Sequence, residues 1–162
     1  MLTKTKNISE NNVYSINTPE YFEISIVPPE MLSSCWEQCT KYLQKATVRS
    51  HGRWTLENLR QKITNNQQHL WISFVPESFT IIGCATTSFV DYPNNRMLSI
   101  EFLGGENMES WVWEGIEKME EWAKDNGCIG IEAIGRKGFW HWLKDKGFDK
   151  SYTVFEKRFN YE

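Results

Sequence analysis

The chain has 162 residues, of which 40% are hydrophobic and 24% charged, and its formal net charge is -3. A chain of this size and apolar content is expected to form one domain whose core needs neither disulfides nor a metal. The near balance of acidic and basic residues argues against nucleic acid as the main partner. No apolar stretch is long enough for a signal peptide or a membrane span, so we expect an intracellular, non-secreted protein.

Residues 1–19 are rich in Asn, Ser, Thr and Lys, which predicts a flexible or partner-ordered arm before a domain over 20–162. The β-branched and aromatic residues of 21–27 predict a first strand, which Pro28 and Pro29 end. Apolar residues then recur at spacings of three and four from Met31 to Leu43, as in a helix with one buried face. Thr55 is the expected N-cap of a second helix.

Three consecutive strands are predicted over 69–75, 80–92 and 96–103, and their short connections imply antiparallel neighbours. A long helix is expected from about Asn107 to Asn126, followed by a strand over 128–134. A short helix containing Trp142 and a terminal strand over 148–159 complete the chain. The predicted fold is α/β, a mixed sheet flanked by helices in the order β-α-α-β-β-β-α-β-α-β.

The cysteines and histidines do not form a metal-binding pattern. The four cysteines lack CxxC spacing and lie in apolar stretches, which predicts free thiols in the core. His51, His69 and His141 are far apart and have no ligand partner three or four residues away, so no metal site is expected. His141 is expected to be exposed, because it projects away from the apolar face of its helix.

Eight tryptophans are many for a domain of this size. Tryptophan is enriched at the centres of protein interfaces, but an aromatic core explains the same composition. Both interpretations remain open at this stage. If a protein partner exists, Trp111, Trp113 and Trp140 are the expected contacts.

Two helix ends carry a family resemblance. The stretch 122–127, WAKDNG, is similar to the end of the central helix of the GNAT acyltransferases, and 142–148, WLKDKGF, is similar to the end of their short helix. The resemblance covers roughly residues 21–160 and implies the GNAT fold. The sequences HGRW at 51–54, VDYP at 90–93, FLGG at 102–105 and SYTV at 151–154 further resemble tailed-phage acetyltransferase-like proteins. That resemblance implies a location in host cytoplasm or virion, with phage structural proteins or a second copy as partners.

The family resemblance implies an acetyl-CoA site where the fourth strand separates from the fifth. There the backbone of Phe102 and Leu103 would hold the thioester, and Gly104 and Gly105 would begin the pyrophosphate loop. The loop here lacks the family's Gln/Arg and its glycine spacing, and Glu106 and Glu109 add negative charge. The alternative interpretation is that the glycines make a tight turn and the glutamates stabilise the helix start.

The resemblance also identifies the positions where catalytic groups are expected. Leu143 stands where the family often has a tyrosine that protonates the thiolate, and leucine cannot donate a proton. Arg136 stands where the family frequently has an asparagine and is a candidate for cofactor binding, although a basic turn is also ordinary surface. Glu101 is the candidate catalytic base, predicted to share a face with Ser99 opposite Leu98, Ile100 and Phe102. A simple polar strand face is the alternative for Glu101.

Two functions follow from these observations. In the first, the chain is a phage-type GNAT-fold protein with a degenerate cofactor site that serves as a binding or virion-associated component. In the second, it is an active acetyl-CoA-dependent N-acyltransferase acting on an amine. Fold resemblance does not decide between them, because function depends on the site rather than the scaffold.

Overall fold

The computed structural model describes residues 21–135 and 137–161. The predicted N-terminal arm, 1–19, lies outside the described residues. The main elements in chain order are β1 (Glu23–Val27), α3 (Leu32–Val48), α4 (Leu56–Thr64), β2 (His69–Val75), β3 (Thr80–Asp91), β4 (Arg96–Gly105), α5 (Val112–Asp125), β5 (Cys128–Ala133) and α6 (Trp140–Leu143). Short 3₁₀ helices are η2 (Pro29–Met31), η3 (Met108–Ser110) and η4 (Lys137–Phe139).

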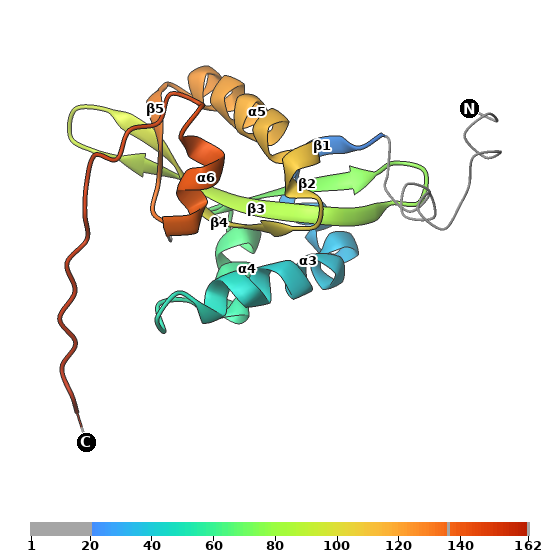
Figure 1. The fold of residues 1–162 in the computed structure, drawn as a ribbon. Helices are drawn as coiled ribbons and strands as arrows, with labels where there is room; N and C mark the ends of the chain where they lie inside the picture. Colours follow the sequence, from blue (N-terminus) through green and yellow to red (C-terminus); the bar gives the residue numbers. More distant parts are fainter. Residues whose placement is uncertain (1–20, 136, 162) are drawn as a thin grey trace, which may run out of the picture.

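One five-stranded mixed sheet organises these elements in the order β1-β2-β3-β4-β5. Strands β1 to β4 form an antiparallel meander, and β5 runs parallel to β4. Helices α3 and α4 cover one face of the sheet, and α5 and α6 cover the other (Figure 1). The predicted fold class, a mixed sheet flanked by helices, is confirmed.

Each face of the sheet has its own core. On the α3–α4 side, Leu43, Leu59 and Ile63 pack on strand residues such as Leu70 and Ile81. On the other side the apolar stripe of α5 meets the sheet through Val112, Ile116, Met119 and Ala123. Cys35, Cys39 and Cys84 are buried, as predicted, and Cys128 is half-buried. All four thiols are free.

Local sequence chemistry explains the ends of several elements. Thr55 accepts a hydrogen bond from the backbone N–H of Asn58, whose side chain accepts one from Thr55 N–H, so the predicted N-cap is part of a capping box. The turn between β3 and β4 is closed by Tyr92 N–H donating to Asn95 carbonyl oxygen, at 2.8 Å. Arg96 also makes two hydrogen bonds to Asp91 across this hairpin, and they lower the pKa of Asp91. The predicted turn at 93–95 is therefore confirmed.

A β-bulge interrupts β4 at Glu101. Thr87 pairs with Ile100 and Thr86 with Phe102, so Glu101 has no residue opposite it on β3. The extra residue changes the side-chain alternation. Ile100 packs on the α5 side, whereas Phe102 packs on the α3–α4 side. The prediction that Phe102 shares a face with Leu98 and Ile100 is therefore wrong, because it assumed an unbroken period of two.

Helix α5 begins at Val112, later than the predicted start near Asn107. Asn107 has a left-handed conformation with φ of 47°, which breaks the helical path between β4 and η3. Trp111 then folds back over the sheet, where its indole N–H donates to the carbonyl oxygen of Glu106 at 2.8 Å. Because this contact holds Trp111 against the sheet, α5 begins only after it, at Val112.

The predicted terminal strand over 148–159 does not form. Residues 148–161 have no regular secondary structure, and almost all of them are exposed. The segment leaves α6, passes β5 and extends beyond the layer formed by α3 and α4 (Figure 1). The composition of the segment favours a strand, but within the described chain it has no strand partner. The order in the structure therefore ends with α6.

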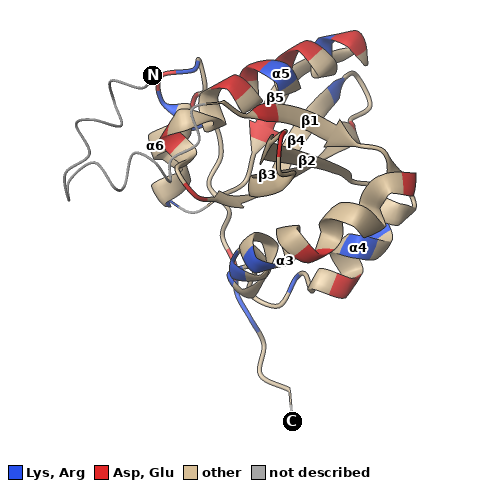
Figure 2. Ribbon diagram, turned by 90° about the vertical axis from the view of Figure 1, so that its right-hand side faces the viewer, with Lys and Arg blue, Asp and Glu red and all other residues tan. Residues whose placement is uncertain are grey.

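Charged residues lie mainly on the outer surfaces of the helices. Figure 2 shows acidic and basic residues interspersed along α4 and α5, in agreement with the small net charge of -3. Within the described residues, no helix is both long and apolar enough to cross a membrane. Residues 21–135 and 137–161 contain no group of three or more His, Cys, Asp or Glu side chains that could hold a metal ion.

Candidate functional site

Strands β4 and β5 separate halfway along β4. Their last pair is Ile100 with Ala133, while β4 continues to Gly105. Past that pair, the backbone of β4 has no neighbouring strand on its β5 side among the described residues. Backbone N–H and C=O groups without a strand partner are available to a ligand or to water. The predicted site residues from Glu101 to Gly105 all lie on this stretch.

The carboxylate of Glu101 is half-buried beside β3. Its Oε1 accepts a hydrogen bond from Ser88 Oγ at 2.8 Å. Ser88 is the strand partner of Ser99, so Glu101 lies on the face of Ser99, as predicted. A carboxylate held in this way can accept a proton, but the bond to Ser88 also satisfies it as an ordinary polar group. Ser88 was missed in the sequence, because its contact with Glu101 depends on the register of the hairpin.

Phe102 and Leu103 point into opposite cores. Phe102 is buried on the α3–α4 side, where its ring meets the edge of Trp54 with 5.9 Å between the centroids. Leu103 is half-buried on the α5 side. The two side chains therefore anchor the backbone of β4 to both faces of the sheet. Trp54 is a second residue that sequence reasoning did not connect with the site.

Gly104 and Gly105 are strand residues rather than turn residues, which corrects the interpretation of them as a tight turn. A Cβ on Gly104 would lie 3.2 Å from the carbonyl oxygen of Tyr42 on α3. A Cβ on Gly105 would lie 2.6 Å from Gly83 Cα and 2.7 Å from the indole of Trp111. The glycines therefore allow α3 and Trp111 to approach the sheet closely.

The carboxylate of Glu106 is held by Tyr42. The hydroxyl of Tyr42 donates to Glu106 Oε2 at 2.9 Å and lies 3.3 Å from the carbonyl oxygen of Ile81. Burial and the bond to Glu106 raise the pKa of Tyr42 well above its usual value, so the phenol stays protonated. The acidic residue in the first turn of α5 is Glu114. Glu109 lies in the first turn of η3, as the interpretation of an acidic helix start expects, whereas Glu106 lies outside both helices.

The space between β4 and α5 is nearly filled. A cavity of about 20 Å³ remains there, lined by Leu103, Trp111, Phe139 and neighbouring apolar residues. Such a volume holds one water molecule at most. Leu143, at the position where the family often has tyrosine, is buried in the same core. This part of the fold is packed as a core rather than as an open channel.

Two further sequence predictions concern the loop before α6 and the helix itself. Arg136, the remaining candidate for cofactor binding, lies outside the described residues. His141 is exposed, as predicted, and its ring lies against Trp142 with centroids 4.7 Å apart.

A larger polar hollow lies on α4, on the other side of the sheet. Its volume is about 380 Å³, and its lining includes Arg53, Trp54, Asn58, Lys62 and Gln67. Trp54 belongs both to this lining and to the contact with Phe102, so it connects the hollow with the bulged part of β4. The hollow carries positively charged and amide groups, which suit a small polar molecule.

The tryptophans belong mostly to the cores. Trp111 is only 4% exposed. Its side chain is therefore not accessible for the contact with a protein partner that the sequence predicts. Trp113 and Trp140 are half-buried, and the indole N–H of Trp113 donates to the carbonyl oxygen of Trp142 at 3.1 Å. Several exposed large aromatic residues lie instead in the C-terminal segment. A protein partner itself remains a prediction.

The five-stranded mixed sheet, its flanking helices and the separation of β4 from β5 define the fold of the GNAT acetyltransferases. The structure is similar to that of an aminoglycoside acetyltransferase from an uncultured soil metagenomic sample, solved with sisomicin. That match has a TM-score of 0.66 and 11% identity and covers 88% of this chain and 97% of the other.

Two further solved structures show the same likeness. A predicted acetyltransferase from Clostridium acetobutylicum, solved with acetyl-CoA, has a TM-score of 0.63 and 16% identity over 85% of this chain and 96% of its own. Glucosamine-6-phosphate N-acetyltransferase from Arabidopsis thaliana has a TM-score of 0.63 and 13% identity over 87% and 100%. No protein-family model and no curated protein matches the sequence. At these identities the likeness establishes the fold alone.

Proposed function

We propose that this chain is a GNAT-fold protein whose cofactor site has degenerated and which serves as a binding component. The proposal rests on the packing of the segment from Gly104 to Glu106, where the fold would hold a pyrophosphate. Its glycines accommodate Tyr42 and Trp111, and the carboxylate of Glu106 lies beside Tyr42. A degenerate site of this kind fits the phage resemblance, with a role in the host cytoplasm or the virion.

Charge supports the same proposal. The pyrophosphate of acetyl-CoA is anionic and is best held by free N–H groups at the start of a helix. Glu109 in η3 and Glu114 in the first turn of α5 bring negative charge to the start of the helix, and Glu106 adds a further carboxylate in the preceding loop. The arginine or glutamine of the family's loop is absent from the sequence. Each carboxylate within several ångströms of the phosphates weakens their binding.

A change of charge tests this account. The double variant Glu106→Gln, Glu109→Gln removes two negative charges, and the amide oxygen introduced at position 106 can still accept the bond from Tyr42. We expect it to bind acetyl-CoA roughly threefold to tenfold more tightly than the unchanged chain. The affinity is measured by calorimetric titration at low ionic strength, where exposed charges act most strongly.

The matched control is Glu120→Gln, Glu121→Gln, which removes the same charge at the other end of α5. We expect this control to leave the affinity for acetyl-CoA within about a factor of two, because these carboxylates lie toward the other end of α5 and the Coulomb interaction falls with distance. Equal affinity of the two double variants would contradict the proposed role of the loop charge.

The second candidate function is an active acetyl-CoA-dependent N-acyltransferase acting on an amine. The separation of β4 and β5, with Glu101 on the bulge, favours it, because a carboxylate stands beside the strand that would hold a thioester. The acetyl-CoA held by the Clostridium acetobutylicum structure is consistent with this candidate. If it is correct, Glu101→Gln abolishes amine-dependent release of thiol from acetyl-CoA.

A further inference from the structure

The polar hollow on α4 has the size of a site for a small molecule. Its volume is about 380 Å³, which lies within the usual range of ligand pockets. Asn58, Lys62 and Asn65 follow one another along α4 at spacings of four and three, so they lie on one face of the helix. Arg53 before the helix and Gln67 after it complete this lining. One helix face and its two flanking segments therefore form the hollow.

The charged side chains that line the polar hollow are positive. Its lining contains Arg53 and Lys62 but no aspartate or glutamate of the described chain, and its other polar side chains are mainly amides. The nearby carboxylate of Glu57 lies outside the lining and accepts a hydrogen bond from Gln61 Nε2 at 3.3 Å. Arginine binds a carboxylate or phosphate through two N–H groups, and lysine adds a point charge. The hollow therefore suits an anion, although the whole chain has a net charge of -3.

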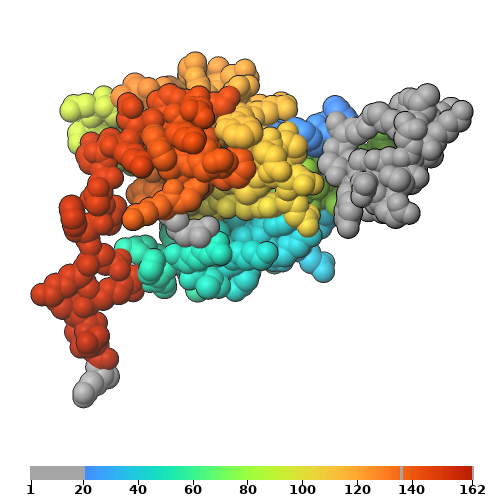
Figure 3. Space-filling view, in the orientation of Figure 1, coloured from blue at the N-terminus to red at the C-terminus, as the bar shows by residue number. Residues whose placement is uncertain are grey.

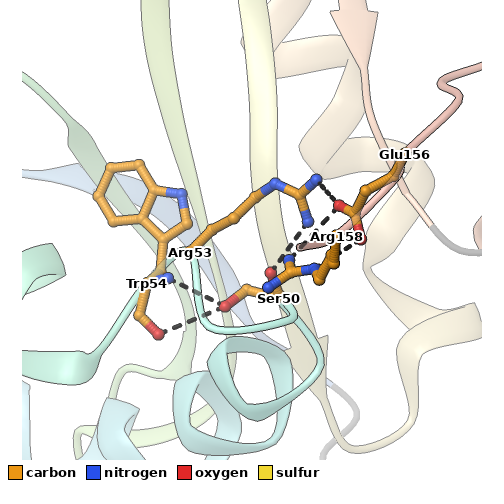
Figure 4. A network of polar contacts seen from close by, with 5 residues as sticks. All are labelled: Ser50, Arg53, Trp54, Glu156 and Arg158. Atoms are coloured by element: carbon orange, nitrogen blue, oxygen red, sulfur yellow. Dashed lines mark hydrogen bonds and ion pairs between the residues drawn. The ribbon is translucent and has the colours of Figure 1, made fainter. Parts of the chain in front are cut away.

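A carboxylate of the same chain contacts one of these cations. The C-terminal segment reaches the layer formed by α3 and α4 (Figure 3). There Glu156 forms a hydrogen bond and an ion pair with Arg53, which lies in the loop between the two helices (Figure 4). Hydrogen bonds from Arg158 and Arg53 lower the pKa of Glu156 to about 2, so its carboxylate is ionised at neutral pH. Glu156 thus shows which chemical group Arg53 accepts.

The contact between Glu156 and Arg53 is weak enough to be displaced. The two side chains are 34% and 50% exposed, and an ion pair in water stabilises a conformation only slightly. Within the part of the chain that the structure describes, no other hydrogen bond or ion pair joins residues 151–161 to the body of the domain. An anionic ligand can therefore compete with Glu156 for Arg53.

We propose that the polar hollow binds a small molecule with two anionic groups, phosphate or carboxylate, which displaces Glu156 from Arg53. One anionic group takes the place of the Glu156 carboxylate, and the other lies near Lys62 in the last turn of α4. Binding depends mainly on charge in an exposed site, so it weakens as the salt concentration rises. Displacement of Glu156 also releases the C-terminal segment from the loop between α3 and α4.

This inference goes beyond the proposed function, because the lining of the polar hollow includes no residue from Glu101 to Glu106. The hollow lies on the α4 side of the sheet, whereas the negative charge that opposes acetyl-CoA lies at the start of α5. Failure of one account leaves the other untouched, since different substitutions test them.

Calorimetric titration of the full chain at low ionic strength tests the site, with pyrophosphate and citrate as separate probes. The double variant Arg53→Gln, Lys62→Gln is expected to weaken binding of the better probe about tenfold or more. The matched control Lys45→Gln, Lys118→Gln removes the same charge from exposed positions on α3 and α5. We expect this control to change the affinity by about a factor of two or less. The stronger probe shows whether the site prefers phosphate or carboxylate.

A second variant tests the competition with the C-terminal segment. Glu156→Gln removes the internal carboxylate and is expected to raise the affinity for the better probe about twofold to sixfold, because less of the site is occupied in the free chain. Glu121→Gln removes the same charge from an exposed position on α5, and we expect a smaller change. Three results would overturn the inference. They are no binding of either probe, equal weakening by the two lysine and arginine pairs, and equal affinities of the two glutamate variants.

Discussion

Replacing Gly83 by alanine is expected to lower the free energy of unfolding by about 3 kcal/mol. A Cβ at this position would overlap the Cζ2 atom of Trp111. The indole cannot move aside easily, because it is buried and its N–H donates to the carbonyl oxygen of Glu106. Urea denaturation followed by tryptophan fluorescence measures the effect.

Two further variants make this prediction specific. Gly138→Ala adds the same methyl group where nothing lies within 4 Å, and we expect it to change the stability by about 0.5 kcal/mol or less. In a Trp111→Leu background the overlap is gone, so Gly83→Ala is expected to cost less than about 1 kcal/mol there. Equal costs in the two backgrounds would show that the indole is not the cause.

Replacing Thr87 by valine is expected to lower the free energy of unfolding by about 1–3 kcal/mol. The buried hydroxyl of Thr87 accepts a hydrogen bond from Trp71 Nε1 at 2.9 Å and lies 3.1 Å from His69 Nδ1. Valine has nearly the same shape but leaves the buried indole N–H without an acceptor. The loss is measured by the same denaturation experiment.

The neighbouring residue supplies a matched control. Thr86 is also 0% exposed, but its hydroxyl has no hydrogen-bond partner among the described residues. Thr86→Val therefore removes a buried polar group that makes no compensating bond, and we expect it to be neutral or stabilising. Equal destabilisation by the two substitutions would contradict these assignments.

Much of the fold could be predicted from local patterns. The apolar spacing from Leu32 to Leu43 and the capping residue Thr55 are sufficient to predict α3 and the start of α4, because both signals lie within a few residues. The strands of the meander could be predicted nearly to the residue, since alternation and turn residues mark both their ends.

Features that depend on distant contacts could not be predicted. The bulge at Glu101 inserts one residue without a pattern of its own, so the face of Phe102 was assigned wrongly. The late start of α5 depends on Trp111 packing against Gly83 and Gly105, which lie on strands outside the helical pattern. Residues 148–161 have a strand-like composition, and composition does not say whether a strand partner exists in the same chain.

The candidate site could be predicted only as a location. Family resemblance placed it on the stretch from Glu101 to Gly105, and this stretch does lie where β4 leaves β5. The contacts that decide its chemistry were not visible in the sequence, because Ser88 and Tyr42 meet Glu101 and Glu106 through strand register and helix packing. Spatial neighbours of this kind leave no periodic signal.

Calorimetric titration of the unmodified full chain with acetyl-CoA tests the central claim most directly. A degenerate site predicts only weak binding, with a dissociation constant of about 1 mM or higher, because Tyr42 holds the carboxylate of Glu106 and the start of α5 carries further negative charge. Micromolar binding with a stoichiometry of one would contradict this account. It would instead favour the acyltransferase candidate and direct the next experiments to Glu101.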